Sequence, residues 1–162
     1  MSEAKKFNFI GQRTIRPDGH DKVTGKANYA ADLALPGMIW GKILRSPHAH
    51  AKILKLDTSK AEAMSGVMSV ATFDDLPSVS NEAIQSGEGA IDSLDLGRNV
   101  LARDKVLYHG HAIAAIAAKT VAIAEKALEL IDVEYEVLTP VLDLHAAMKA
   151  DAPLLHEDMF TQ

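Results

Sequence analysis

The sequence predicts an α+β domain that follows an irregular N-terminal arm. Its 162 residues are 48% hydrophobic and 24% charged, which is enough apolar material for one globular core. Apolar and turn-forming residues predict the order strand, strand, helix, strand, loop, strand, helix, strand, helix, which contains two strand–helix–strand units. Residues 1–26 are polar and contain Pro17, Gly19 and Gly25. We therefore expect an extended arm there and the folded domain over residues 27–162.

The first two strands are expected on either side of a histidine-containing stretch. Pro36-Gly37 favours a turn, and the apolar run after it predicts a largely buried strand over residues 38–46. Residues 50–57 predict a second strand with imperfect alternation, because Lys52 falls on the same side as two leucines.

A short helix and a third strand are expected next. The Asp-Thr-Ser sequence that ends at Ser59 is a helix start signal, and Glu62 stands where it would return a capping-box hydrogen bond to Ser59. Gly66 is the expected left-handed residue that ends this helix. Residues 67–73 then predict a strand.

The second half of the chain begins with an expected loop. Residues 77–99 are polar and contain glycines, and a loop of this length is typical of a functional or partner-binding segment. Residues 105–118 predict either two strands or one strand broken at Gly110. Thr120 is the expected N-cap of the clearest helix, over residues 121–131.

The C-terminal part is expected to return to a sheet before a last short helix. Residues 132–138 alternate, with Val133 and Tyr135 on one side, as in a half-buried strand. Asp143 is the expected N-cap of a helix over residues 144–150.

Charge and residue types exclude several classes of function. The net charge is −5 and the pI is about 5.8, so nothing favours binding to nucleic acid or to an anionic membrane. Cysteine is absent, which excludes disulfides, a thiolate nucleophile and cysteine ligands within this chain. The longest apolar run, Ala112–Ala118, is too short to span a bilayer, and the N-terminus has no signal-peptide pattern. We therefore expect a cytoplasmic protein.

Two His-x-His pairs raise the question of a metal site. His48 and His50 lie two residues apart, as do His109 and His111, so each pair would share one face of a strand. Four imidazoles are in principle a zinc or copper site. However, neither pair has an adjacent carboxylate to orient the rings. We expect structural histidines and no metal-binding residues, with a small metal protein as the alternative.

Three stretches carry a family resemblance: "RPDGHDKVTGKANYAADL", "PGMIWGKILRSPHAHAKILKLDTSKAEAMSGVMSVAT" and "HAIAAIAAKTVAIAEKALELIDVEYEVL". Together they resemble the start of the molybdenum-binding large subunit of the xanthine dehydrogenase, aldehyde oxidase and carbon monoxide dehydrogenase family. The likeness covers roughly residues 10–158. It implies the α/β hammerhead domain, with a mixed sheet and two main helices.

The resemblance also implies a reaction and its cofactors. Members of the family hydroxylate a carbon centre with water as oxygen donor, or oxidise carbon monoxide, at a molybdenum bound through a molybdopterin. Electrons leave through iron–sulfur clusters to FAD, often on separate subunits. The pterin loop and the catalytic glutamate of the family lie downstream of the matching segment. We therefore expect no catalytic and no cofactor-binding residues in this chain.

The same resemblance suggests where the chain meets its partners. These are expected to be the molybdopterin-binding domains of the same subunit and the iron–sulfur and flavin subunits. Arginine suits bidentate pairing with a partner carboxylate, and a polar arm this rich in family-like residues is expected to contact something outside its own domain. The candidate docking residues are Lys22, Thr24, Gly25, Tyr29, Arg45, His48 and His50.

Two departures from the family pattern keep a second function open. Residues 109–111, His-Gly-His, stand where the family more often has a small or apolar residue, a glycine and an acidic or amide residue. Ser65 stands where a proline is frequent. The chain is then either part of a molybdenum enzyme, inactive by itself, or a stand-alone hammerhead module used for binding or assembly.

Overall fold

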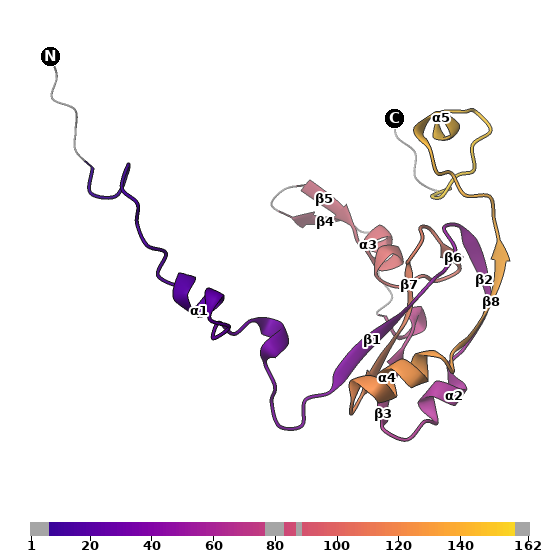
Figure 1. The fold of residues 1–162 in the computed structure, drawn as a ribbon. Coiled ribbons are helices and arrows are strands. Elements are labelled where there is room, and N and C mark those ends of the chain that lie inside the picture. The colour runs from indigo at the N-terminus through magenta and orange to yellow at the C-terminus, as the bar shows by residue number, and fades with distance from the viewer. Residues whose placement is uncertain (1–6, 77–82, 87–88, 158–162) are drawn as a thin grey trace, which may run out of the picture. The chain divides into compact units, whose positions relative to one another are not determined.

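The structure is a computed structural model, and it describes residues 7–76, 83–86 and 89–157. These residues form two compact units, of which one ends at Pro36 and the other begins at Gly37 (Figure 1). The boundary between arm and domain that we expect at residues 26 and 27 stays a prediction.

The N-terminal unit contains two short helical turns. Helix α1 spans Gly19–Val23, and a 3-10 turn spans Ala30–Asp32. No side chain is buried between residues 7 and 36. Gly25 follows the end of α1 with φ +73°, a left-handed conformation that glycine adopts without strain. Apart from these two short turns, the described residues of this unit form no helix or strand.

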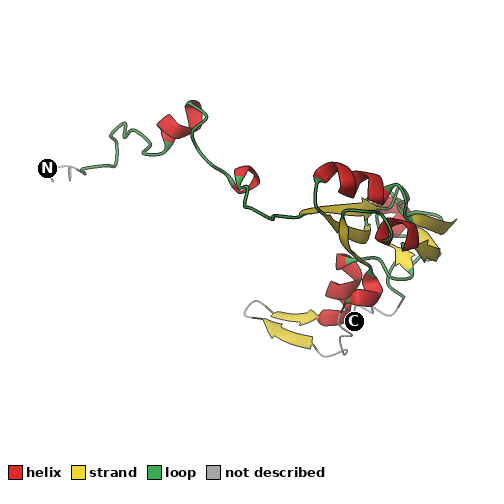
Figure 2. Cartoon of the chain, turned by 90° about the horizontal axis from the view of Figure 1, so that it is seen from below, coloured by secondary structure: helices red, strands yellow, loops and turns green. Residues whose placement is uncertain are grey.

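All strand pairs in the described part of the chain are antiparallel, and they form three sheets. The first sheet has the order β1-β7-β3, the second has the order β6-β2-β8, and β4 and β5 form a separate hairpin (Figure 2). The α+β class is confirmed, whereas the single mixed sheet is replaced by these antiparallel sheets. The strands are Trp40–Arg45 (β1), Ala51–Asp57 (β2), Val67–Ala71 (β3), Ala83–Ser86 (β4), Gly89–Asp92 (β5), Lys105–Val106 (β6), Ala112–Ala118 (β7) and Asp132–Val137 (β8).

The helices of the second unit are short, and α4 packs against β1 and β7 of the first sheet. A salt bridge of 2.8 Å between Lys42 of β1 and Glu125 of α4 lies at the edge of this contact. The helices are Ser59–Glu62 (α2), Ser93–Val100 (α3), Val121–Leu128 (α4) and Leu144–Ala147 (α5), with a 3-10 turn over Phe73–Asp75.

Strand β7 is the centre of the fold because both of its faces are buried. On one side Ile116 packs with Ala124 and Ala127 of α4, and on the other side Ile113 packs with Val106 of β6. Each fully buried isoleucine contributes about 1.5–3 kcal/mol to the free energy of unfolding. Ala114 and Ala118 lie on the same face as Ile116 and belong to the same cluster.

Three local signals in the sequence are confirmed. Thr120 Oγ1 accepts a hydrogen bond of 3.2 Å from the backbone N–H of Ile123, and Asp143 Oδ1 accepts one of 2.9 Å from Ala146. Gly66 has φ +93°, as expected for the left-handed residue after a helix. These signals can be predicted from the sequence because each depends on residues within one helical turn.

The start of α2 corrects the expected capping box. The backbone N–H and the hydroxyl of Ser59 both donate to Asp57 Oδ1, at 3.1 and 2.6 Å, while Glu62 accepts from Thr58 Oγ1. Asp57 takes the place expected of Glu62 as the hydrogen-bond partner of Ser59. Its carboxylate lies two residues before Ser59 and reaches both the N–H and the hydroxyl directly. The side-chain hydrogen bond from Ser59 is the main reason that the pKa of Asp57 falls to about 2, and Lys55 adds to the effect.

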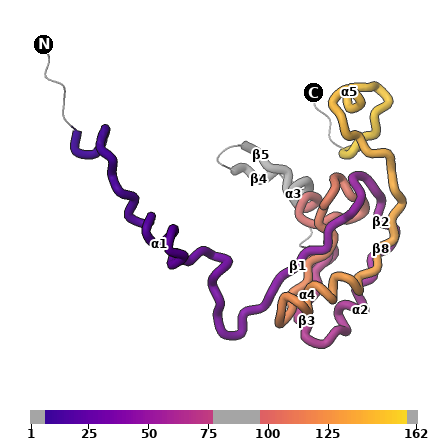
Figure 3. The backbone as a smooth tube through the Cα atoms, in the orientation of Figure 1, coloured from indigo at the N-terminus to yellow at the C-terminus, as the bar shows by residue number. Residues whose placement is uncertain are grey.

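A bulge explains the imperfect alternation of the second strand. Strands β2 and β8 run side by side (Figure 3). In their pairing Ile53 lies opposite Tyr135 and Lys55 lies opposite Glu134, so Leu54 is an extra residue. An extra residue reverses the phase of the strand, because side chains alternate with a period of two. Leu54 is exposed, and Leu56, which would share its face in a regular strand, packs against the core instead.

The middle of the chain contains more regular structure than the sequence predicts. The predicted loop over 77–99 contains β4, β5 and most of α3, whereas residues 77–82, 87 and 88 lie outside the described residues. Residues 105–118 are two strands, β6 and β7, and these belong to different sheets. Within residues 7–76, 83–86 and 89–157, no helix has the length and apolar character needed to cross a membrane.

Candidate docking site

Four of the predicted docking residues lie in the N-terminal unit: Lys22, Thr24, Gly25 and Tyr29. Lys22 Nζ lies 2.8 Å from Asp18 Oδ2, one turn earlier in α1. Thr24 Oγ1 donates to the carbonyl oxygen of His20 at 2.7 Å and so closes the end of the helix. Tyr29 is 58% exposed. Local contacts therefore occupy the lysine and the threonine, while the tyrosine ring is available to a partner.

The other three predicted residues, Arg45, His48 and His50, lie at the connection between β1 and β2. The expectation that the two histidines share a strand face is wrong, because the chain turns between residues 46 and 50. Ser46 stabilises this turn: its buried hydroxyl accepts from the N–H of His48 at 3.0 Å. The His48 ring meets Tyr135 of β8 edge to face, with the ring centres 4.9 Å apart.

Tyr135 links this connection to the second sheet. Burial raises the pKa of its phenol, and a hydrogen bond with Ser46 opposes part of that rise. The ring thus contacts both His48 and Ser46, two residues that lie far from it in sequence. The turn is held by the body of the domain, which favours a fixed shape over a mobile loop.

His50 is the most deeply buried of the predicted docking residues. Only 5% of its surface is exposed, and its Nδ1 lies 2.9 Å from the carbonyl oxygen of Thr139. Because a carbonyl only accepts, Nδ1 carries the proton and Nε2 is the acceptor of the neutral ring. Nε2 is buried and has no hydrogen-bond partner within the described residues. A buried acceptor without a donor costs about 1–3 kcal/mol, so a donor from outside these residues would stabilise this histidine.

Arg45 joins the connection to a second turn, around Gly110. Its Nη1 donates to the carbonyl oxygen of Gly110 at 2.9 Å. Backbone hydrogen bonds add to this link: the N–H of Ser46 donates to His111 O at 2.9 Å, and the N–H of Gly110 donates to Ser46 O at 3.0 Å. Arg45 itself is exposed, so its remaining donors face solvent.

His111 is fully buried, and the sequence did not reveal its role. Its Nδ1 accepts from the N–H of Leu107 at 3.2 Å, which leaves the proton on Nε2, and Nε2 lies 3.0 Å from the carbonyl oxygen of Arg98. The ring also stacks on Tyr108 at 4.4 Å. Burial lowers the pKa of His111, so the neutral ring that these contacts require is favoured.

Backbone groups already use several ring nitrogens of the two His-x-His pairs. No group of three or more histidine, aspartate or glutamate side chains in the described residues is arranged to hold a metal ion. One nitrogen of His50 and both nitrogens of His111 are already used by backbone groups, and His109 is exposed on the turn. The arrangement is a well-connected turn that has Arg45 at its surface and the Nε2 of His50 buried within it.

Comparison with known protein families gives one match. Residues 24–139 match the family described as "Aldehyde oxidase and xanthine dehydrogenase, a/b hammerhead domain". The matched range includes the connection between β1 and β2, the Gly110 turn and every strand of the first two sheets.

Two curated proteins illustrate the similarity in sequence. The chain is 45% identical over 144 residues to a probable xanthine dehydrogenase subunit of Bacillus subtilis, which covers 89% of this chain and 18% of that protein. It is 39% identical over 156 residues to the "Carbon monoxide dehydrogenase large chain" of Afipia carboxidovorans, which covers 96% of this chain and 18% of that protein. The chain therefore spans less than a fifth of the length of these relatives.

Solved structures show the same fold. A Cu,Mo-CO dehydrogenase chain superposes with a TM-score of 0.76 at 36% identity, over 94% of this chain and 18% of that chain. The aldehyde oxidoreductase of Desulfovibrio gigas gives a TM-score of 0.72 at 32% identity, over 88% of this chain and 16% of that chain. The hammerhead architecture expected from the sequence is confirmed.

Proposed function

Because this chain belongs to the aldehyde oxidase and xanthine dehydrogenase family through its a/b hammerhead domain, we propose that it serves as the hammerhead part of a molybdenum-dependent dehydrogenase or hydroxylase. In this proposal the chain has a structural and docking role, and by itself it is inactive. The observation that carries the proposal is the match over residues 24–139, together with 45% identity to a probable xanthine dehydrogenase subunit.

The chemistry of the described residues supports a role without catalysis. The sequence has no cysteine, so it supplies no thiolate ligands for an iron–sulfur cluster. No three ligand side chains are grouped among the residues that the structure describes. These two facts bear on an iron–sulfur cluster and on a bare metal ion, and in our proposal the molybdopterin, the iron–sulfur clusters and FAD belong to other parts of the assembly.

The turn between β1 and β2 is the part of the second unit that best suits docking. Arg45 is fixed by one hydrogen bond to Gly110 and keeps further guanidinium donors for a partner carboxylate or carbonyl. The buried Nε2 of His50 has the opposite need, a donor such as a backbone N–H. The proposed partners are the molybdopterin-binding domains and the iron–sulfur and flavin subunits, in a cytoplasmic assembly.

The test is purification of the tagged chain from its own host under native conditions, with molybdenum measured by mass spectrometry. We expect molybdenum to elute with the chain in a complex of defined size, together with flavin absorbance. A chain that elutes alone, or in a complex free of molybdenum and flavin, contradicts the proposal and indicates a stand-alone module. As a control, the complex is denatured before elution, so that molybdenum separates from the chain and the elution position of free cofactor is known.

A further inference from the structure

A cavity of about 480 Å³ lies in the second unit. Its walls come from β2 and β6, from the end of α3, and from residues 155–157 near the C-terminus. The size falls in the range of pockets that bind small organic molecules. Neither the family match nor the proposed docking role assigns anything to this cavity.

The cavity is basic although the chain as a whole is acidic. Its lining includes the cations Lys52, Arg98, Arg103 and Lys105, against two carboxylates, Asp104 and Glu157. The whole chain has a net charge of −5. Such a local excess of positive charge raises the concentration of anions at the cavity.

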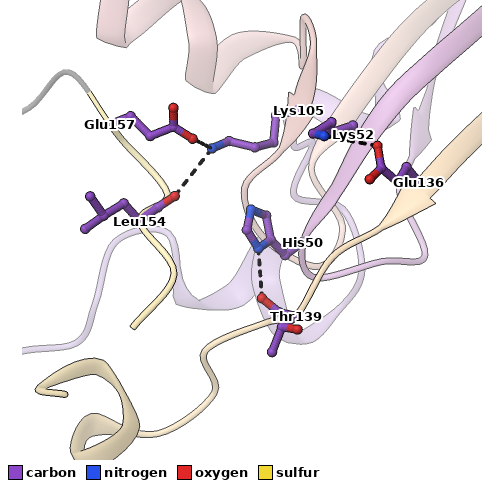
Figure 4. A network of polar contacts seen from close by, with 7 residues as sticks. All are labelled: His50, Lys52, Lys105, Glu136, Thr139, Leu154 and Glu157. Atoms are coloured by element: carbon purple, nitrogen blue, oxygen red, sulfur yellow. Dashed lines mark hydrogen bonds and ion pairs between the residues drawn. The ribbon is translucent and has the colours of Figure 1, made fainter. Parts of the chain in front are cut away.

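Two of these cations come from paired strands. Lys52 of β2 and Lys105 of β6 are direct partners in the antiparallel register, so their side chains stand on the same face. The Lys52 ammonium turns to the other neighbour of β2, where it lies 3.1 Å from Glu136 Oε2 of β8, whereas the Lys105 ammonium extends towards the C-terminal segment (Figure 4). Lys105 is therefore the member of the pair that an incoming anion can use.

The hydrogen bonds that Lys105 now makes are long, so a ligand could make shorter ones. Figure 4 shows Lys52 with Glu136 and Lys105 with the C-terminal segment. The Lys105 side chain is only 22% exposed, yet its contacts are long, at 3.4 Å to Leu154 O and 3.5 Å to Glu157 Oε1. Hydrogen bonds from an ammonium to a carboxylate are normally about 2.7–2.9 Å. A half-enclosed ammonium with two long contacts favours an incoming oxyanion.

The apolar part of the lining defines the body of the ligand. Phe73, Leu107 and Leu155 contribute to the wall beside His156, and the Arg103 guanidinium lies over the Phe73 ring at 5.2 Å from its centre. Arg103 Nε also lies 3.4 Å from Asp104 Oδ1, so this guanidinium already has a carboxylate nearby. The cavity therefore combines an oxyanion position at Lys105 with an apolar wall.

We propose that this cavity binds a small organic carboxylate, with its oxyanion at Lys105 and its apolar body against Phe73. Glu157 is an example of the proposed interaction between a carboxylate and Lys105, because its own carboxylate reaches Lys105 from the C-terminal segment. It acts as a weak internal competitor that a free carboxylate displaces. The site is independent of the proposed docking role.

The experiment titrates the purified 162-residue chain with benzoate at low salt by calorimetry, with benzamide as the neutral isostere. We expect saturable binding of one benzoate and at least about tenfold weaker binding of benzamide. Lys105→Gln should weaken benzoate about tenfold and Lys52→Gln should weaken it less, because Glu136 already pairs the Lys52 ammonium, whereas Lys126→Gln, on the exposed face of α4, should have no effect. Glu157→Gln should strengthen binding several-fold because the internal competitor is lost. Circular dichroism melts check that each variant is folded.

Several results would overturn the site. Equal binding of benzoate and benzamide would show an apolar crevice without an oxyanion position. Binding that is unchanged in both lysine variants would place the benzoate elsewhere. If inorganic phosphate binds as tightly as benzoate, the apolar wall contributes nothing to binding and the proposed class of ligand is wrong. Absence of benzoate binding at millimolar concentration in both the native chain and Glu157→Gln would end the proposal.

Discussion

His111 Nε2 lies 3.0 Å from the carbonyl oxygen of Arg98, and this contact closes the C-terminal end of α3. The last carbonyls of a helix have no partner within the helix. Here a ring from the turn before β7 supplies the missing donor, while its other nitrogen accepts from Leu107. Residues 109–111 depart from the family pattern, and the third of them, His111, thus has a structural role.

Replacement of His111 by alanine should lower the free energy of unfolding by about 2–4 kcal/mol, because it removes the hydrogen bonds of the ring with the Leu107 N–H and the Arg98 carbonyl and opens a cavity. Denaturant unfolding followed by circular dichroism measures this loss. His109→Ala is the matched control, because His109 lies two residues away on the same turn and is exposed. Equal losses in the two variants would contradict the capping role of His111.

The stability of the domain should also depend on pH through His111. Burial holds its pKa below 6.5 in the folded protein, while the unfolded chain keeps a value of about 6.5. As the pH falls below about 6.5 the unfolded chain gains a proton first, so the free energy of unfolding declines until the folded protein also binds one. His111→Ala should remove this part of the pH dependence, and His109→Ala should retain it. Melts between pH 8 and pH 5 provide the comparison.

Gly66→Ala should destabilise the second unit more than Gly110→Ala. Both glycines have positive φ, +93° and +83°, so both variants carry backbone strain of about 1–2 kcal/mol. Only at Gly66 would the new Cβ also meet a side chain, since it would lie 2.7 Å from Ile123 Cδ1. Adding Ile123→Val to Gly66→Ala should recover part of the difference. No recovery in the double variant would mean that the clash is not the cause.

The carboxylate of Asp57 should titrate near pH 2 and respond to its neighbour. The side-chain hydrogen bond from Ser59 is the largest cause of the lowered pKa, followed by the backbone N–H of Ser59. In Ser59→Ala we expect the pKa of Asp57 to rise towards its ordinary value of about 3.9, as measured by NMR titration of the side-chain carbonyl. Thr58→Ala leaves both bonds in place and should leave the titration near pH 2. Because the folded-state pKa is depressed, the stabilisation from Asp57 is present above about pH 4 and is lost towards pH 2.

Arg45→Ala should separate docking from folding if the proposed function holds. The variant loses one exposed hydrogen bond to Gly110, which contributes about 0.5–1.5 kcal/mol, so the melting temperature of the lone chain should change by a few degrees only. In the native purification, the molybdenum that elutes with the chain should fall several-fold. Lys22→Ala tests the arm in the same way, and Lys60→Ala, an exposed lysine of α2, is the control. Normal assembly of both the Arg45 and Lys22 variants would remove these residues from the docking surface.

The sequence predicted features that depend on neighbouring residues and missed those that depend on distant ones. Thr120 and Asp143 are caps because their targets lie three residues away. Helix α3 escaped prediction because it contains Gly97 and its last turn is completed by His111, 13 residues after Arg98. The bulge at Leu54 was visible only as a broken alternation, since its cause is the register with β8.

The candidate site shows the same limit. A His-x-His spacing is compatible with a strand, and only the hydroxyl of Ser46 and the ring of Tyr135 show why residues 46–50 turn instead. The buried state of His50 could be suspected from its place next to an apolar strand. That its Nε2 lacks a donor within the described residues follows only from the coordinates.

The pairing of the strands has a consequence for synthesis of the chain. Within the described residues, β1, β2 and β3 all lie before residue 76, and each pairs only with strands from residue 105 onward. As the chain leaves the ribosome, its first half therefore presents three strands with unpaired edges until β6 and β7 have been made. Contacts this distant in sequence form slowly, and unpaired edges invite aggregation in the meantime. Yield in a heterologous host should consequently respond more to chaperone supply and growth temperature than to the stability of the finished domain.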